Sequence, residues 1–147
     1  MTMQQILDAV HGFDGVLVVE PHAAPFPELA WGDAFFSYAP DGVMPERTQP
    51  YGTIITKDYP DDESSRLSAA GRFRVNIHVG GRRVAEVADP AADAADADVI
   101  VRHPVYGDAG WVSIVNPGTA TTGTVLALLK EAHDAARART RRRAERG

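Results

Sequence analysis

The sequence predicts an α+β fold: a single-domain, two-layer sandwich whose mostly antiparallel sheet has about five strands, with an N-terminal helix and a long C-terminal helix. Short β-branched or aromatic runs fill the middle of the chain, and helical periodicity marks both ends. Strands grouped together with helices at the ends are typical of α+β proteins. A length of 147 residues, 44% hydrophobic and 24% charged, suits one globular core.

The first predicted element is a helix over residues 3–12. Thr2 and Gln5 have the spacing of a capping box, in which each side chain bonds the other residue's backbone N–H. Ile6 and Val10 then recur at helical spacing and give the helix one apolar face.

Five short runs predict the strands: the first three are β-branched or aromatic and bounded by Pro, Gly or Asp, and the fourth alternates between apolar and polar residues. The turn Ala39-Pro-Asp-Gly42 separates the second run from the third and predicts an antiparallel hairpin or meander. The runs cover residues 16–20, 34–38, 52–57, 73–79 and 111–115.

The C-terminal helix is expected to begin at Thr121 or Thr122. Its apolar stripe at i, i+3, i+4 and i+7 packs on the sheet, and it contains Val125, Leu128, Leu129, Ala132 and Ala136. We expect residues 1–136 to form the domain and residues 137–147 to be a basic helix end or tail. Residues 82–87 predict a short helix, and the Asp- and Ala-rich stretch 89–98 predicts a surface excursion.

The net charge of −5 is unevenly distributed along the chain. Six arginines lie in the last eleven positions, so residues 1–136 carry nine basic and nineteen acidic side chains, a charge of −10. Affinity for nucleic acid comes mainly from cations that neutralise phosphates, so this charge disfavours nucleic-acid binding by the folded part. The tail is interpreted either as a solvated helix end or as a contact for an acidic partner.

Membrane insertion and secretion are disfavoured, because no apolar run approaches the roughly 18–20 residues of a membrane span and the first residues lack a signal-peptide pattern. The chain has no cysteine, which excludes disulfides and thiolate metal sites. A cytoplasmic location is therefore expected. We also expect no cofactor, since no phosphate-binding or dinucleotide-binding glycine motif is present. The histidine and carboxylate spacings give no metal-site pattern.

Three segments carry a resemblance to a known family. They are Lys57-Asp-Tyr59, Gly71-Arg-Phe-Arg-Val-Asn-Ile77 and the run from His103 to Pro117. Together they resemble domain-of-unknown-function family 6194, an uncharacterised bacterial group frequent in actinobacteria. The element order also resembles that of the MmcQ/YjbR-like group, in which a tryptophan-bearing strand leads into a C-terminal helix on an antiparallel sheet. Neither resemblance implies an activity or a catalytic residue.

The strand over residues 73–79 carries the first candidate site residues. Its alternation places Phe73 and Ile77 on one face and Arg74, Asn76 and His78 on the other. The three polar side chains predict a pocket for an anionic or carbonyl-bearing small molecule, because the arginine fork can bind a carboxylate through two parallel bonds. The alternative is an ordinary solvated sheet face.

The segment from His103 to Trp111 supplies the remaining candidates. His103 precedes a proline and Tyr106 precedes a glycine, which predicts a loop that closes over a pocket. His103 is a candidate acid or base, and Tyr106 and Trp111 are candidate aromatic walls. The alternative places both aromatic residues in the core and uses His103 to satisfy loop carbonyls.

These residues support two main hypotheses of function and leave open whether the protein is an enzyme. The first is a small-molecule-binding protein or auxiliary enzyme whose pocket lies on the polar sheet face. The second is a non-catalytic interaction module, a homodimer that uses the sheet face or exposed aromatics at Phe35, Phe36 and Tyr38. Nucleic-acid binding ranks third.

Overall fold

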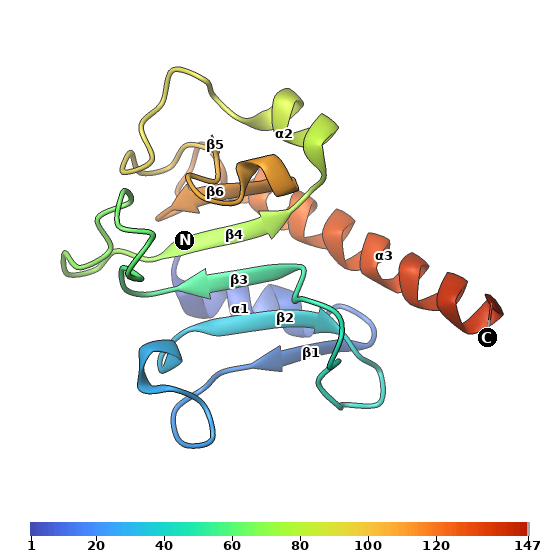
Figure 1. The fold of residues 1–147 in the computed structure, drawn as a ribbon. Coiled ribbons are helices and arrows are strands. Elements are labelled where there is room, and N and C mark those ends of the chain that lie inside the picture. The colour runs from blue at the N-terminus through green and yellow to red at the C-terminus, as the bar shows by residue number, and fades with distance from the viewer. Residues whose placement is uncertain (147) are drawn as a thin grey trace.

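The computed structural model describes residues 1–146 and confirms the predicted α+β domain (Figure 1). Helices stand at both ends of the chain, and the strands lie between them. The elements are α1 (Met3–His11), β1 (Val16–Val19), η1 (Glu28–Ala30), β2 (Ala34–Tyr38), β3 (Gly52–Ile55), β4 (Arg74–His78), α2 (Gly81–Val87), β5 (Val101–Arg102), η2 (Gly107–Ala109), β6 (Trp111–Val115) and α3 (Thr122–Arg146).

The sheet has six strands in the order β1-β2-β3-β4-β6-β5, and every neighbouring pair is antiparallel. The first four strands form the expected meander, and β6 then pairs with the far side of β4. The sixth strand, β5, was not expected. It contains only Val101 and Arg102, which is too short for an alternating pattern to indicate a strand.

The hydrophobic core lies between one face of the sheet and the two long helices, α1 and α3 (Figure 1). Val75 and Ile77 of β4 point into it, as the alternation predicts. Phe36 also lies there with no exposed surface, so its expected role as an exposed aromatic is wrong. Because side chains alternate along β2, Phe35 is the one aromatic residue of this strand that lies on the opposite face.

A buried polar contact joins α3 to the sheet side of the molecule. The Nδ1 atom of His133 on α3 lies 3.0 Å from the hydroxyl of Tyr51, and its Nε2 atom lies 2.7 Å from the backbone oxygen of Asp14. A carbonyl can only accept, so Nε2 carries the proton and Nδ1 accepts from the hydroxyl of Tyr51. Both side chains are buried, and this pair therefore fixes the middle of α3.

The start of α3 is capped by Asp98, which belongs to the acidic excursion. Its carboxylate accepts from the backbone N–H groups of Gly118, Ala120 and Thr121 and from the hydroxyl of Thr121. These hydrogen bonds lower the pKa of Asp98 to about 2, and the bond from the hydroxyl of Thr121 has the largest effect. Asp98 therefore gives the excursion a structural role at the helix N-terminus, where a negative charge is favourable.

The second sheet face carries no α-helix, and two loops cover part of it; this face is called the helix-free face. In the β3–β4 loop (residues 56–73), Leu67 packs on Ile55 and Val115 in a small second core. The β5–β6 loop (residues 103–110) closes over the other end of the same face. Within residues 1–146, no helix combines the length and the apolar character that crossing a membrane requires.

Candidate functional site

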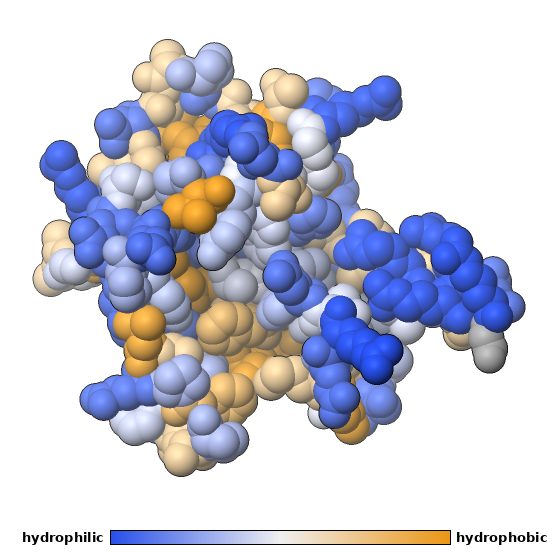
Figure 2. Space-filling view, in the orientation of Figure 1, coloured by the Kyte–Doolittle hydropathy of each residue, from blue (hydrophilic) through white to orange (hydrophobic). Residues whose placement is uncertain are grey.

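The candidate site lies on the helix-free face, where strand register aligns its polar side chains. Asn76 of β4 pairs with Thr53 of β3 on one side and with Ser113 of β6 on the other. The alternation predicted for β4 places Arg74 and His78 on this face as well. Figure 2 shows the face from outside: its floor is pale to orange, and hydrophilic loops surround it.

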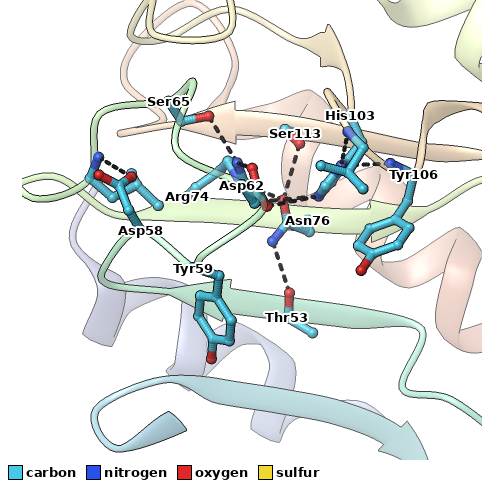
Figure 3. A network of polar contacts seen from close by, with 12 residues as sticks. Thr53, Asp58, Tyr59, Asp62, Ser65, Arg74, Asn76, His103, Tyr106 and Ser113 are labelled. Carbon is cyan, nitrogen blue, oxygen red and sulfur yellow. Dashed lines mark hydrogen bonds and ion pairs between the residues drawn. The ribbon is translucent and has the colours of Figure 1, made fainter. Parts of the chain in front are cut away.

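Arg74 is the centre of a buried ion pair. Its side chain has no exposed surface, although it is a charged residue. Its guanidinium donates to both carboxylate oxygens of Asp62, to the hydroxyl of Ser65 at 2.9 Å and to Asn76 Oδ1 at 2.8 Å (Figure 3). Burial alone would raise the pKa of Asp62, but the hydrogen bonds and charge of Arg74 outweigh it and hold that pKa below its usual value. The charge of Arg74 is therefore neutralised within the protein.

Asn76 extends this network toward the open part of the face. Its Oδ1 atom accepts from Arg74 and, at 3.0 Å, from the hydroxyl of Ser113. Its Nδ2 atom donates to the hydroxyl oxygen of Thr53 at 3.0 Å. Thr53 is only half-buried, and its own hydroxyl hydrogen is not used in the network. The buried chain of bonds thus ends at a donor on the open face.

His103 is buried and holds the β5–β6 loop in place. Its Nδ1 atom accepts from the backbone N–H groups of Val105 and Tyr106, each at 3.0 Å. Nδ1 therefore carries no proton, and Nε2 lies 3.3 Å from a guanidinium nitrogen of Arg74 and 3.8 Å from an oxygen of Asp62. Burial and the nearby charge of Arg74 lower the pKa of His103 to about 4. The ring is therefore neutral at pH 7. The alternative role considered for His103 was to bond loop carbonyls, but the ring accepts hydrogen bonds from loop N–H groups instead.

His78, Trp111 and Tyr106 surround the open end of the face. The Nε2–H group of His78 donates to the backbone oxygen of Ala109 at 3.1 Å, because a carbonyl can only accept. Its Nδ1 atom has no partner within residues 1–146 and is left as an acceptor. The ring of His78 lies 5.5 Å from that of Trp111, and the ring of Tyr106 lies 5.0 Å from that of His103. Tyr106 is 56% exposed, so it stands at the edge of the site rather than in the core.

A second buried carboxylate, Asp33, was not among the residues predicted from the sequence. It accepts from the backbone and hydroxyl of Thr56, from Lys57 at 3.1 Å and from the hydroxyl of Tyr59 at 2.5 Å. Burial and the contact with Asp33 raise the pKa of Tyr59. These bonds fix the start of the loop that brings Asp62 to the site. The sequence analysis did single out the Lys57-Asp-Tyr59 segment, which supplies two of these donors, but nothing in that segment indicates that Asp33 is their acceptor.

The structure thus divides the six predicted residues into two groups. Arg74, Asn76 and His103 form the buried floor with Asp62, which the sequence analysis did not select. His78, Tyr106 and Trp111 lie above and beside that floor. In the part of the chain that the structure describes, no three His, Cys, Asp or Glu side chains come together in a way that could hold a metal ion.

Comparison with known proteins gives one match. The model of a family of unknown function, DUF6194, matches residues 1–145, nearly the whole chain. No curated protein and no solved structure is similar to the chain in the corresponding comparisons. The likeness to the MmcQ/YjbR-like group and the bacterial source stay predictions.

Proposed function

The chain belongs to the DUF6194 family, whose function is not known, and we propose that it binds a small carbonyl-bearing molecule on the helix-free sheet face. The binding surface consists of Thr53, His78, Tyr106 and Trp111. The buried network around Arg74 forms its floor.

One observation is the main support for this proposal: the polar groups of the floor are hydrogen-bonded to each other, while the polar groups above the floor have no hydrogen-bond partner within the protein. Within the described residues, no protein group bonds the indole N–H of Trp111, the hydroxyl of Tyr106 or Nδ1 of His78. Ligand sites typically combine apolar and aromatic walls with a few polar groups that fix orientation. This surface has two aromatic walls, three free donors including the hydroxyl of Thr53, and a free nitrogen acceptor in Nδ1 of His78.

The charge balance favours a neutral carbonyl compound over an anion. Asp62 already binds Arg74 through both oxygens, so the fork expected to hold a ligand carboxylate is occupied. Displacing Asp62 would leave a buried charge without a partner, which is costly. A ligand carbonyl can instead accept from the free donors of Tyr106 or Trp111. A ligand N–H or O–H group can donate to Nδ1 of His78.

The geometry supports binding more strongly than proton transfer. His103 cannot accept a proton at Nδ1 without losing two hydrogen bonds from its own loop. His78 is the histidine with a free nitrogen on the open face, so a proton-transfer step at this site would use His78. The proposal therefore assigns His78 the role of a ligand acceptor.

The test follows the two tryptophan side chains by NMR. A set of small neutral amides and ketones is added to ¹⁵N-labelled protein, and the indole N–H signals of Trp111 and Trp31 are compared. Trp31 is the internal control, because its indole donates to the backbone oxygen of Phe26. Selective, saturable shifts of the Trp111 signal that are lost in His78→Ala support the proposal. Equal shifts of both signals, or none, contradict it.

The alternative of a homodimeric interaction module has less support. Of the three aromatic residues expected to meet a partner, Phe36 lies in the core and Tyr38 packs edge-on against His133. Phe35 alone contributes to the helix-free face. A small-molecule site makes fuller use of the free polar groups on that face.

A further inference from the structure

The C-terminal part of α3 extends beyond the domain core. The last buried residue of this helix is Ala136, and residues 137–146 are half-buried or exposed. Ten helical residues span about 15 Å. In Figures 1 and 2 this arm stands away from the sheet as a hydrophilic lobe. We call residues 137–146 the arginine arm.

The arm concentrates positive charge at a cost to the helix. It carries six arginines and one glutamate, a net charge of +5. Arg139 lies three and four residues before Arg142 and Arg143, and like charges at these spacings destabilise a helix. Burial and the charges of Arg143 and Arg142 lower the pKa of Arg139. A helical segment without a core and with mutual repulsion gains stability from an anionic partner.

Few carboxylates compensate this charge within residues 1–146. Of the six arginines of the arm, only Arg137 comes within 4.0 Å of a carboxylate in that part of the chain: its guanidinium lies 3.9 Å from the carboxylate of Asp14. Its Nε atom has no hydrogen-bond partner in the same part of the chain. Arg143 donates to the hydroxyl of Thr48, a neutral group. The arm therefore presents guanidinium groups whose donors are mostly free.

The arginines are arranged along two edges of the helix. At about 100° per residue, Arg137 and Arg141 share one edge, and Arg139, Arg142, Arg143 and Arg146 share an edge on roughly the opposite side. A surface groove runs along the outer side of α3. Its lining consists of Asp134, Arg137, Ala138, Arg141 and Arg142.

We propose that the arginine arm binds a DNA duplex, lying in the major groove with its two basic edges against the two phosphate backbones. A helix is about 10–12 Å across and the B-DNA major groove about 12 Å wide. Arginine forks fit phosphate oxygens through two parallel bonds. Between the two edges, one side of the helix carries only the small side chains of Thr140 and Ala144, so the helix axis can approach the groove floor on that side.

The acidic remainder of the chain is compatible with this contact and limits its strength. Residues 1–136 carry a charge of −10 and repel phosphates. The arm extends about 15 Å, farther than the Debye length of about 8 Å at physiological ionic strength, so the two charges are partly screened from each other. A membrane surface is a poorer partner, because the arm lacks the large apolar side chains that enter lipid.

The test measures binding of the full chain to a fluorescein-labelled 20-base-pair DNA duplex by fluorescence anisotropy. With about four phosphates neutralised, the affinity should fall roughly 150-fold between 50 and 200 mM NaCl. The double variant Arg142→Gln, Arg146→Gln should lose about tenfold or more in affinity at 50 mM NaCl and show a weaker salt dependence. Glutamine keeps the helix propensity, which circular dichroism verifies.

The matched control is the double variant Arg82→Gln, Lys130→Gln, which makes the same change in net charge outside the arm. It should bind the duplex within about twofold of the unmodified chain, because neither residue lies in the arm. The proposal is overturned if the unmodified chain does not bind the duplex at 50 mM NaCl. It is also overturned if the arm variant and the control variant lose the same affinity. Poly-L-glutamate binding more tightly than the duplex would assign the arm to an acidic protein segment instead.

Discussion

Replacing Asp62 by Asn tests the assignment of Arg74 as a buried, internally neutralised cation. The substitution keeps the shape of the side chain but leaves a guanidinium with no exposed surface without its counter-charge. Breaking a buried ion pair by removing one partner costs about 3–5 kcal/mol. The side chain of Asp62 is 11% exposed, so we expect the low end, about 3 kcal/mol. This corresponds to a loss of about 6–12 °C in Tm.

The pH dependence separates the loss of charge from a loss of packing. The pKa of Asp62 is lower in the folded chain than in the unfolded one, so its contribution to stability is complete above the unfolded value of about 3.9. It is lost as the pH falls below that value and through the folded pKa. Urea denaturation at several pH values should show the difference between wild type and Asp62→Asn narrowing below about pH 4.

Glu63→Gln is the matched control for this experiment. Glu63 is the adjacent carboxylate and is exposed, so its neutralisation should change the free energy of unfolding by less than about 0.5 kcal/mol. A result for Asp62→Asn within the same limit would refute the reasoning, because Arg74 would then not depend on Asp62.

Three further substitutions test other parts of the structure. Asp98→Ala removes the cap of α3 and should lower Tm at pH 6; because the pKa of Asp98 is about 2, the difference from wild type should disappear as the pH falls from about 4 to about 2 in thermal melts. Tyr51→Phe leaves Nδ1 of His133 without its donor and should cost about 2 kcal/mol in urea denaturation; a loss no larger than that of Tyr38→Phe would contradict the assigned bond. His103→Phe removes the acceptor of two loop N–H groups, so amide exchange at Val105 and Tyr106 should accelerate about tenfold while exchange in β3 stays unchanged.

The fold could be predicted from the sequence because its main elements have strong local patterns. The alternation of β4 predicts which side chains enter the core, and the stripe from Val125 to Ala136 predicts the packed part of α3. β5 could not be predicted, because its two residues are too few to show an alternating hydrophobic pattern. Phe36 was misplaced because two adjacent aromatics on one strand point to opposite faces, and no single strand reveals which face is buried.

The candidate site could be predicted only in part, since its partners come from distant segments. The alternation on β4 indicates that Arg74 and Asn76 share a face with His78. It does not indicate that the β3–β4 loop folds back and delivers Asp62 to Arg74. The same holds for Asp33, which is separated from Tyr59 by two strands and a loop. Such contacts depend on tertiary structure, whereas sequence patterns report mainly on neighbours along one element.

The measurement that tests the central proposal most directly is native mass spectrometry of the protein as purified. The spectra of the unmodified chain, His78→Ala and the control His22→Ala are compared under gentle desolvation. A ligand held on the helix-free face predicts a small added mass in the unmodified chain and in His22→Ala, and its loss in His78→Ala. A bare protein mass in all three, or an added mass that survives His78→Ala, would contradict the proposal.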